Sequence, residues 1–111
     1  MPELYKLAAR RCEIIEEIDM IRSMRKGTLS ERYNKVTNKK GEEVLNGPYY
    51  VLTKKGIGNK TVSEAIPATD MPRVQNDVDN YKQFRQLADE YTDVCERLSQ
   101  LTVDEDEGKK N

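Results

Sequence analysis

Lysines and tyrosines in the middle of this 111-residue chain are the side chains best suited to recognise a ligand. Residues 26–66 carry eight basic and four acidic side chains, a net charge of +4, whereas the whole chain carries −1. Ammonium groups bind phosphates, and tyrosines stack on bases or donate hydrogen bonds to phosphate. The pattern predicts a nucleic-acid-binding site made of Lys35, Lys39, Lys40, Tyr49, Tyr50, Lys54, Lys55 and Lys60.

The glycine-rich segment 56–59 is the place where this site could approach a ligand most closely. Lys54, Lys55 and Lys60 flank it, and glycines allow a backbone to come near a partner. An alternative explanation needs no ligand, because lysines on an exposed strand also prevent pairing between sheet edges. Both interpretations stay open at the level of sequence.

Catalytic and metal-binding chemistry receive little support. The chain has no histidine and two cysteines, which removes histidine bases and ligands and leaves too few thiols for a structural zinc site. Adjacent carboxylates such as Glu16 and Glu17 diverge by about 100° on a helix, so they do not converge on one atom. We therefore expect no catalytic residue, no metal site, no cofactor and no enzymatic activity.

The distribution of apolar residues indicates the cellular compartment in which we expect the protein. No apolar run approaches the length of a membrane span, and the amino-terminal residues lack a signal-peptide core. These features favour a cytoplasmic protein with reduced thiols. Cys12 and Cys95 fit the role of small core residues.

Two amphipathic helices are predicted to position the basic segment. Residues 3–26 have apolar side chains at helical spacing and end before Gly27, a favoured helix stop. Residues 71–101 form the second helix, with Asp70 as its N-cap. Its main apolar stripe consists of Val74, Val78, Tyr81, Phe84, Ala88, Tyr91, Cys95 and Leu98, widened by Leu87, Val94 and Leu101.

The segment 28–66 is predicted to form a β-sheet. Turn signals occur at 38–41, 46–48 and 56–59, and β-prone runs at 48–53 and 60–66 lie between or after them. Residues 28–36 fit either a third strand or a short helix, because Thr28-Leu29-Ser30-Glu31 is also a capping-box pattern.

These elements predict an α+β fold. Two long helices would form an antiparallel, coiled-coil-like hairpin, with a small antiparallel β-sheet inserted between them. We expect one domain over residues 1–103 and a disordered polar tail over 104–111.

The order of several motifs resembles an uncharacterised family of small bacterial and archaeal proteins, often encoded beside transposases. The resemblance covers residues 18–101, and its most specific part is Gly47-Pro48-Tyr49-Tyr50. Typical members carry a cysteine-rich cluster before this motif and a histidine immediately ahead of its glycine. Here residues 37–43 contain no such ligand and Asn46 precedes Gly47, so a metal site of that kind is absent.

The function expected from these observations is non-enzymatic binding of nucleic acid, most simply DNA, by the basic β-region on a helical scaffold. The resemblance supports this expectation only through the frequent location of the family's genes beside transposase genes. The alternative is a protein–protein adaptor or homodimer that acts through the seam of helices 3–26 and 71–101. Salt dependence separates the two, because counterion release weakens phosphate binding as salt rises.

Overall fold

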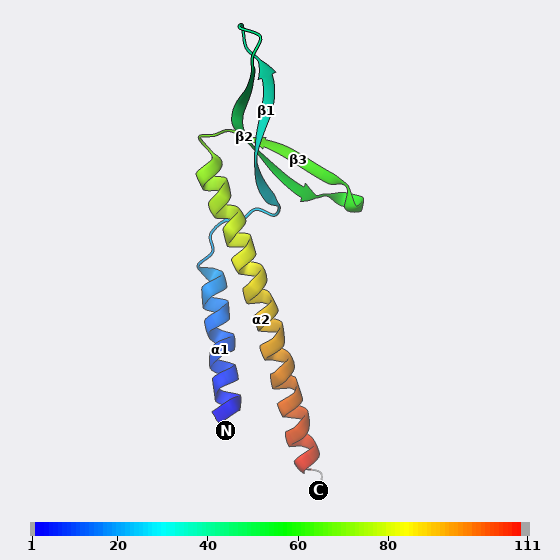
Figure 1. The fold of residues 1–111 in the computed structure, drawn as a ribbon. Helices are drawn as coiled ribbons and strands as arrows, with labels where there is room; N and C mark the ends of the chain where they lie inside the picture. Colours follow the sequence, from blue (N-terminus) through cyan, green and yellow to red (C-terminus); the bar gives the residue numbers. More distant parts are fainter. Residues whose placement is uncertain (1, 110–111) are drawn as a thin grey trace. The chain divides into compact units, whose positions relative to one another are not determined.

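The computed structural model describes the backbone of residues 2–109 and the side chains of residues 3–102. This part of the chain contains two α-helices and three strands, which are labelled in Figure 1. Their order is α1 (Pro2–Asp19), β1 (Thr28–Thr37), β2 (Glu43–Lys55), the short 3-10 helix η1 (Ile57–Asn59), β3 (Thr61–Ile66) and α2 (Met71–Lys109).

The chain divides into two compact units. The helical unit contains Met1–Arg22 and Lys82–Asn111, and the sheet unit contains Ser23–Tyr81. Helix α2 therefore contributes its first part to the sheet unit and its remainder to the helical unit.

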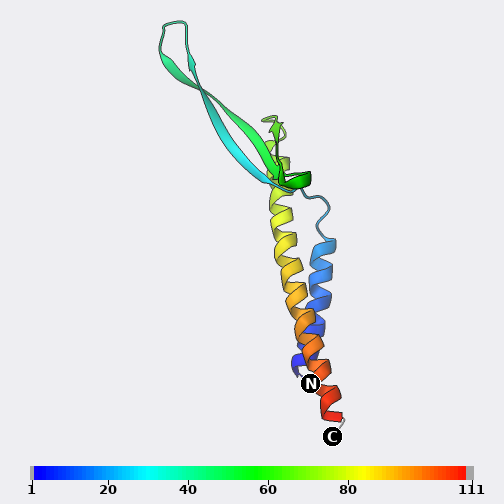
Figure 2. The same ribbon diagram turned by 90° about the vertical axis from the view of Figure 1, so that its right-hand side faces the viewer.

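The sheet unit is built on three antiparallel strands in the order β1-β2-β3. Central strand β2 has 13 residues, and only its second part pairs with strands on both sides. Thr28 of β1 pairs with Thr53, and Ile66 of β3 pairs with Tyr50. The first part of β2, residues 43–49, pairs with β1 alone, so these two strands form a two-stranded ribbon without β3. Figure 2 shows this ribbon.

An irregularity in the ribbon explains the Gly47-Pro48 motif. Arg32 pairs with Tyr49 and Asn34 pairs with Asn46, so the single residue Tyr33 faces the two residues Gly47 and Pro48. Gly47 has φ +135°, and a Cβ there would lie 3.0 Å from the carbonyl oxygen of Arg32. The β-bulge therefore requires a residue without a side chain at this position.

The core of the sheet unit forms where the start of α2 packs on the sheet. Leu52 and Ile66 are buried against Val74 and Val78 of α2, and Leu29 and Tyr50 pack around them. Hydrogen bonds also hold residues 23–25, which precede β1, to the same part of α2. The Arg25 amide donates to the carbonyl oxygen of Asp77 at 3.0 Å, and the Ser23 hydroxyl donates to the Asp77 carboxylate at 2.5 Å.

The helical unit has its own smaller core. Ile14 of α1 is buried against Leu87 and Val94 of α2, with partly buried Leu7, Ile18, Ile21, Tyr91 and Leu98 around them. Arg10 pairs with Glu90, and Arg97 pairs with Glu3. These pairs show that α1 runs antiparallel to this part of α2.

The predicted helical hairpin with an inserted sheet is wrong, although the α+β content of two helices and a three-stranded antiparallel sheet is present. The elements follow one another as helix, sheet and helix, and the helices do not pair along matched lengths. Helix α1 ends at Asp19 instead of residue 26, because residues 23–25 bond to α2. Val74 and Val78, predicted to join the seam between the helices, pack on the sheet instead.

The other predicted boundaries can be placed on these elements. Residues 28–36 form strand β1, so the strand alternative was the right one. Helix α2 reaches Lys109 and thus includes most of the predicted tail, whereas residues 110–111 lie outside the described residues. The domain boundary at 103 stays a prediction.

Candidate anion-binding site

A pocket of about 490 Å³ lies in the sheet unit, where β1 begins and β2 ends. It is open to solvent, and a cavity of this size is typical of ligand sites. Its walls contain three lysines, three threonines and one glycine, namely Lys26, Gly27, Thr28, Thr53, Lys54, Lys55 and Thr61. Every polar side chain in this lining is a cation or a hydroxyl.

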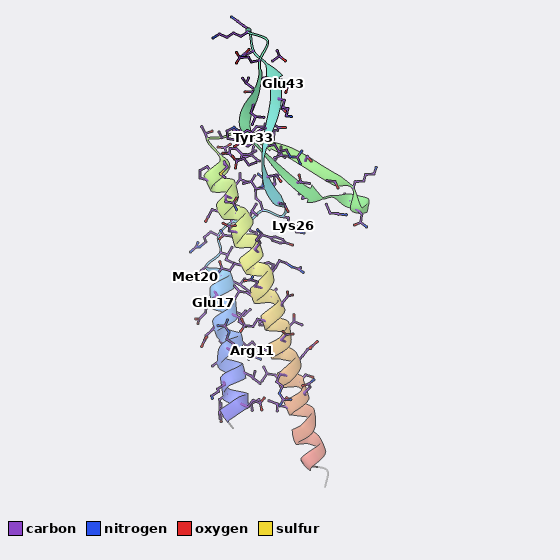
Figure 3. The ribbon with its side chains drawn as sticks, in the orientation of Figure 1. Arg11, Glu17, Met20, Lys26, Tyr33 and Glu43 are labelled. Atoms are coloured by element: carbon purple, nitrogen blue, oxygen red, sulfur yellow. The ribbon has the colours of Figure 1, made fainter. Side chains whose placement is uncertain are left out.

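Gly27 makes this arrangement possible. It has φ +126°, and a Cβ there would lie 2.7 Å from the carbonyl oxygen of Thr53 and 3.3 Å from the Cβ of Lys54. Only glycine allows the chain to enter β1 so close to β2. The close approach places Lys26 beside the end of β2, and Figure 3 labels Lys26 just before the start of β1.

The positive charge of the pocket is not neutralised locally. Lys26, Lys54 and Lys55 make no ion pair with any described side chain (residues 3–102). Glu64, the acidic residue of β3, is paired with Arg25. Three unpaired ammonium groups around one pocket produce a local positive potential, which favours an anionic ligand.

Hydroxyl groups add directional donors to this charge. The Oγ1 atom of Thr53 is buried and has no hydrogen-bond partner among the described residues. A buried hydroxyl without a partner costs free energy, so its presence in a pocket wall is compatible with a ligand that accepts its hydrogen bond. Thr28 and Thr61 provide two further hydroxyls. Ammonium and hydroxyl donors together suit phosphate oxygens.

The structure divides the eight predicted site residues between the two ends of β2. Lys54 and Lys55 line the pocket, and Lys60 follows the adjoining turn, which is closed by a 2.7 Å hydrogen bond from the Gly56 amide to the Lys60 carbonyl oxygen. Lys39 and Lys40 lie in the turn between β1 and β2, at the other end of β2, and Lys35 lies on the ribbon part of β1.

The tyrosines have structural roles between these ends. Tyr50 packs against the core of the sheet unit. The Tyr49 hydroxyl donates to Oδ1 of Asn34 at 3.1 Å, and its side chain is partly exposed. The Tyr33 hydroxyl donates to Glu31 at 2.6 Å, and this bond to a carboxylate raises the pKa of Tyr33. None of the three lines the pocket.

Lys26 is the residue that sequence reasoning missed. The sequence predicts Lys26 at the end of helix 3–26, where it contributes to the net charge of residues 26–66 but not to the predicted site. The only signal that could have placed it in the site is the register between Thr28 and Thr53, which is a property of the folded sheet. Among residues whose side chains are described, no group of histidine, cysteine or carboxylate side chains could hold a metal ion. Within that same range, neither helix has the length and hydropathy needed to cross a membrane.

Comparisons of the chain with protein-family models, with curated proteins and with solved structures find no match. The resemblance to proteins encoded beside transposases stays a prediction.

Proposed function

We propose that this protein binds nucleic acid without catalysing a reaction, and that the pocket at the junction of β1 and β2 holds the phosphate backbone. The observation that carries this proposal is the convergence of Lys26, Lys54 and Lys55 on one pocket whose lining contains no carboxylate. Lys60, on the adjoining turn, extends the same positive surface.

The chemistry of the lining favours recognition of backbone over recognition of bases. Lysine contributes a point charge that contacts phosphate from many directions, and threonine donates a single hydrogen bond. Reading a base edge requires paired donors and acceptors, which arginine, asparagine and glutamine provide. The described lining has none of these three residue types, so we expect affinity without sequence preference.

An adaptor that works through the seam between the helices is the less supported alternative. The seam residues Ile14, Leu87 and Val94 are already buried against one another in the helical unit. A partner at this seam would have to displace one of the two helices.

The proposal can be tested by fluorescence anisotropy with labelled duplex and single-stranded oligonucleotides of random sequence over a salt series. Binding should weaken steeply with salt, with about 0.9 in the slope of log affinity against log salt for each duplex phosphate contacted. Replacing Lys26, Lys54 and Lys55 together by alanine should lower affinity at every sequence and flatten this slope by about 2 to 3.

A matched control removes the same charge from the other end of β2. The variant with Lys35, Lys39 and Lys40 replaced by alanine loses three lysines from the ribbon and its turn. We expect a smaller loss of affinity, because Glu42 and Glu43 lie next to Lys39 and Lys40 in the sequence and offset their charge. Equal losses in the two variants would show that net charge, and not the pocket, determines binding. Failure of the unmodified protein to bind at low salt would overturn the proposal.

A further inference from the structure

One face of the sheet is turned away from α2. Leu52 and Ile66 pack on α2, so the positions that alternate with them along the strands lie on the other side, which we call the open face. Residues that pair directly across two strands share a face. The open face therefore includes Thr28 and Thr53 at the pocket, and Arg32, Asn34, Asn46 and Tyr49 on the ribbon.

The bulge in the ribbon keeps Asn46 on the open face. The extra residue in β2 shifts the register by one position, so that Asn46 pairs with Asn34. In a regular ladder of the same sequence, Asn46 would pair with Lys35 and lie on the opposite face. The bulge thus places two asparagines side by side on the open face.

The charges of the sheet are divided unequally between its two faces. The acidic residues of the three strands all lie on the face opposite the open face, where Glu31, Glu43 and Glu64 pair with Tyr50, Thr37 and Leu52. Arg32 is exposed on the open face and makes no ion pair with a side chain of residues 3–102. An unpaired cation among neutral polar groups is complementary to a polyanion.

The polar side chains of the ribbon on this face are of the types that recognise base edges. Arginine donates to two acceptors of guanine, and asparagine pairs with a donor and an acceptor of adenine. The Tyr49 hydroxyl donates to Oδ1 of Asn34 at 3.1 Å. This bond orients the amide and leaves its Nδ2 donors and one lone pair of Oδ1 for a base. Tyr49 is therefore a positioning residue.

Apolar side chains continue the open face toward the turn. Val36 pairs with Val44, and the two residues are 40% and 39% exposed. A partner that offered only phosphates would leave them in water. The major groove of DNA presents the C5-methyl group of thymine, which makes apolar contacts with such side chains.

The dimensions of the ribbon also fit the major groove of DNA. From Arg32 to Thr37 the ribbon extends about 17 Å, at about 3.4 Å per residue. The groove is about 12 Å wide and admits a two-stranded ribbon. The major groove of duplex RNA is too narrow for side chains to read. Of the two duplexes, DNA is the one that this ribbon can enter.

We propose that the ribbon enters the major groove of DNA, where Arg32 contacts a guanine and Asn34 or Asn46 contacts an adenine. Arg32 and Asn34 are about 7 Å apart along β1, which equals two base-pair steps of about 3.4 Å. Thr28 lies about 14 Å from Arg32 on the same strand, so the pocket can hold a phosphate of the same duplex. This inference rests on the proposed binding of nucleic acid. It adds a sequence preference that the pocket lining cannot supply.

The test begins with selection of duplex DNA from a randomised library by the full chain, followed by sequencing. We expect enrichment of sites with a guanine and an adenine about two base pairs apart. Replacing the enriched guanine by 7-deazaguanine removes its N7 acceptor, which only the major groove exposes. Affinity should then fall about fivefold or more. Duplex RNA of the selected sequence should bind no more tightly than random duplex RNA.

Arg32→Lys tests the assigned residue, because lysine keeps the charge but lacks the paired donors of arginine. Affinity for the selected site should fall about fivefold or more, whereas affinity for random duplex DNA should change less than about twofold. Arg73→Lys is the matched control, because Arg73 is an exposed arginine of α2 that pairs with Asp70. It should leave the selected sequence unchanged. Tyr49→Phe should weaken the preference for adenine and keep that for guanine.

The outcomes distinguish this inference from the proposed function. Salt-dependent binding of random duplex DNA without any enriched sequence would overturn the recognition of bases and leave the pocket proposal standing. An enriched site that Arg32→Lys and 7-deazaguanine both leave unaffected would do the same. Absence of binding to every duplex at low salt would overturn both proposals.

Discussion

Arg10 of α1 donates two hydrogen bonds to Glu90 of α2, from Nε to Oε2 at 2.5 Å and from Nη2 to Oε1 at 2.7 Å. This bidentate geometry is the strongest that arginine makes with a carboxylate. Together with the pair between Arg97 and Glu3, it fixes the direction in which α1 lies along α2. The same contact lowers the pKa of Glu90 and raises that of Arg10.

The lowered pKa of Glu90 predicts an acid-sensitive contribution to folding. Because the pKa is lower in the folded than in the unfolded chain, this contribution is complete above the unfolded pKa and is lost as pH falls through the folded pKa. Glu90→Gln should therefore destabilise the protein at neutral pH and reduce the fall in stability on acidification. Urea unfolding at a series of pH values measures both effects.

Glu96→Gln is the control for this prediction, because Glu96 makes no ion pair or hydrogen bond among the described side chains. It should leave the pH profile close to that of the unmodified chain. Identical profiles for Glu90→Gln and the unmodified chain would show that the ion pair contributes nothing to stability.

Gly27→Ala should destabilise the sheet unit. The new Cβ would meet the Thr53 carbonyl oxygen, and φ +126° is a conformation that side chains rarely adopt. We expect a loss of about 1–3 kcal/mol in the free energy of unfolding, the range of strained backbone positions. Gly41→Ala separates the two causes, because Gly41 also has positive φ but nothing lies within 4 Å of its added Cβ. A cost at Gly27 no larger than at Gly41 would mean that the close approach is not a constraint.

Thr53→Val should separate folding from ligand binding. The Thr53 hydroxyl is buried without a partner, so replacing it by a methyl group should leave the free energy of unfolding within about 1 kcal/mol or raise it. If the hydroxyl donates to a bound phosphate, affinity for oligonucleotides should fall in the same variant. Thr28→Val, which alters an exposed threonine of the same pocket, is the comparison. Strong destabilisation by Thr53→Val would indicate that the hydroxyl has a partner in the folded protein.

The neighbouring residues Ile14 and Ile15 test the core of the helical unit. Ile14 is 0% exposed and Ile15 is 50% exposed. Ile14→Ala should cost about 2–5 kcal/mol, the usual range for removing a buried isoleucine side chain. Ile15→Ala should cost much less, because half of this side chain is already exposed to solvent. Similar costs at the two positions would contradict the orientation of α1.

The strands were more predictable from sequence than the helix ends. Turn residues around Gly41 and Gly58 mark both reversals of the sheet, and glycine is favoured there because φ is positive. The turn expected at 46–48 is wrong, because these residues lie inside β2, where Gly47 and Pro48 form the bulge. The end of α1 had no comparable local signal. Apolar periodicity continues through Ile21 and Met24, but the hydrogen bonds that draw residues 23–25 to Asp77 of α2 are tertiary contacts. Only the folded chain reveals them.

The same limit applies to the packing of α2 and to the pocket. A wide apolar arc on α2 does not show which edge meets α1, so Ala88 and Cys95 were expected where Leu87 and Val94 are buried. The charge pattern identified Lys54 and Lys55 as candidate ligand contacts. Their partner Lys26 depends on the pairing of Thr28 with Thr53, which joins residues far apart in the chain.

The bulge opposite Tyr33 has a consequence for how this sequence can change through insertion and deletion. Alternate residues of a strand point to opposite faces, so gaining or losing one residue within Val44–Asn46, where the pairing is one to one, would exchange the faces of the residues beyond the change. Losing Gly47 or Pro48 would leave one residue opposite Tyr33, which removes the bulge but keeps Asn34 paired with Asn46. The turn at Asn38–Glu42 has no such constraint, because it is closed by its own bonds to Asn38 and Gly41 faces open space. Insertions and deletions should therefore be tolerated at this turn and selected against only a few residues further along. The turn is thus the natural position for grafting a peptide tag.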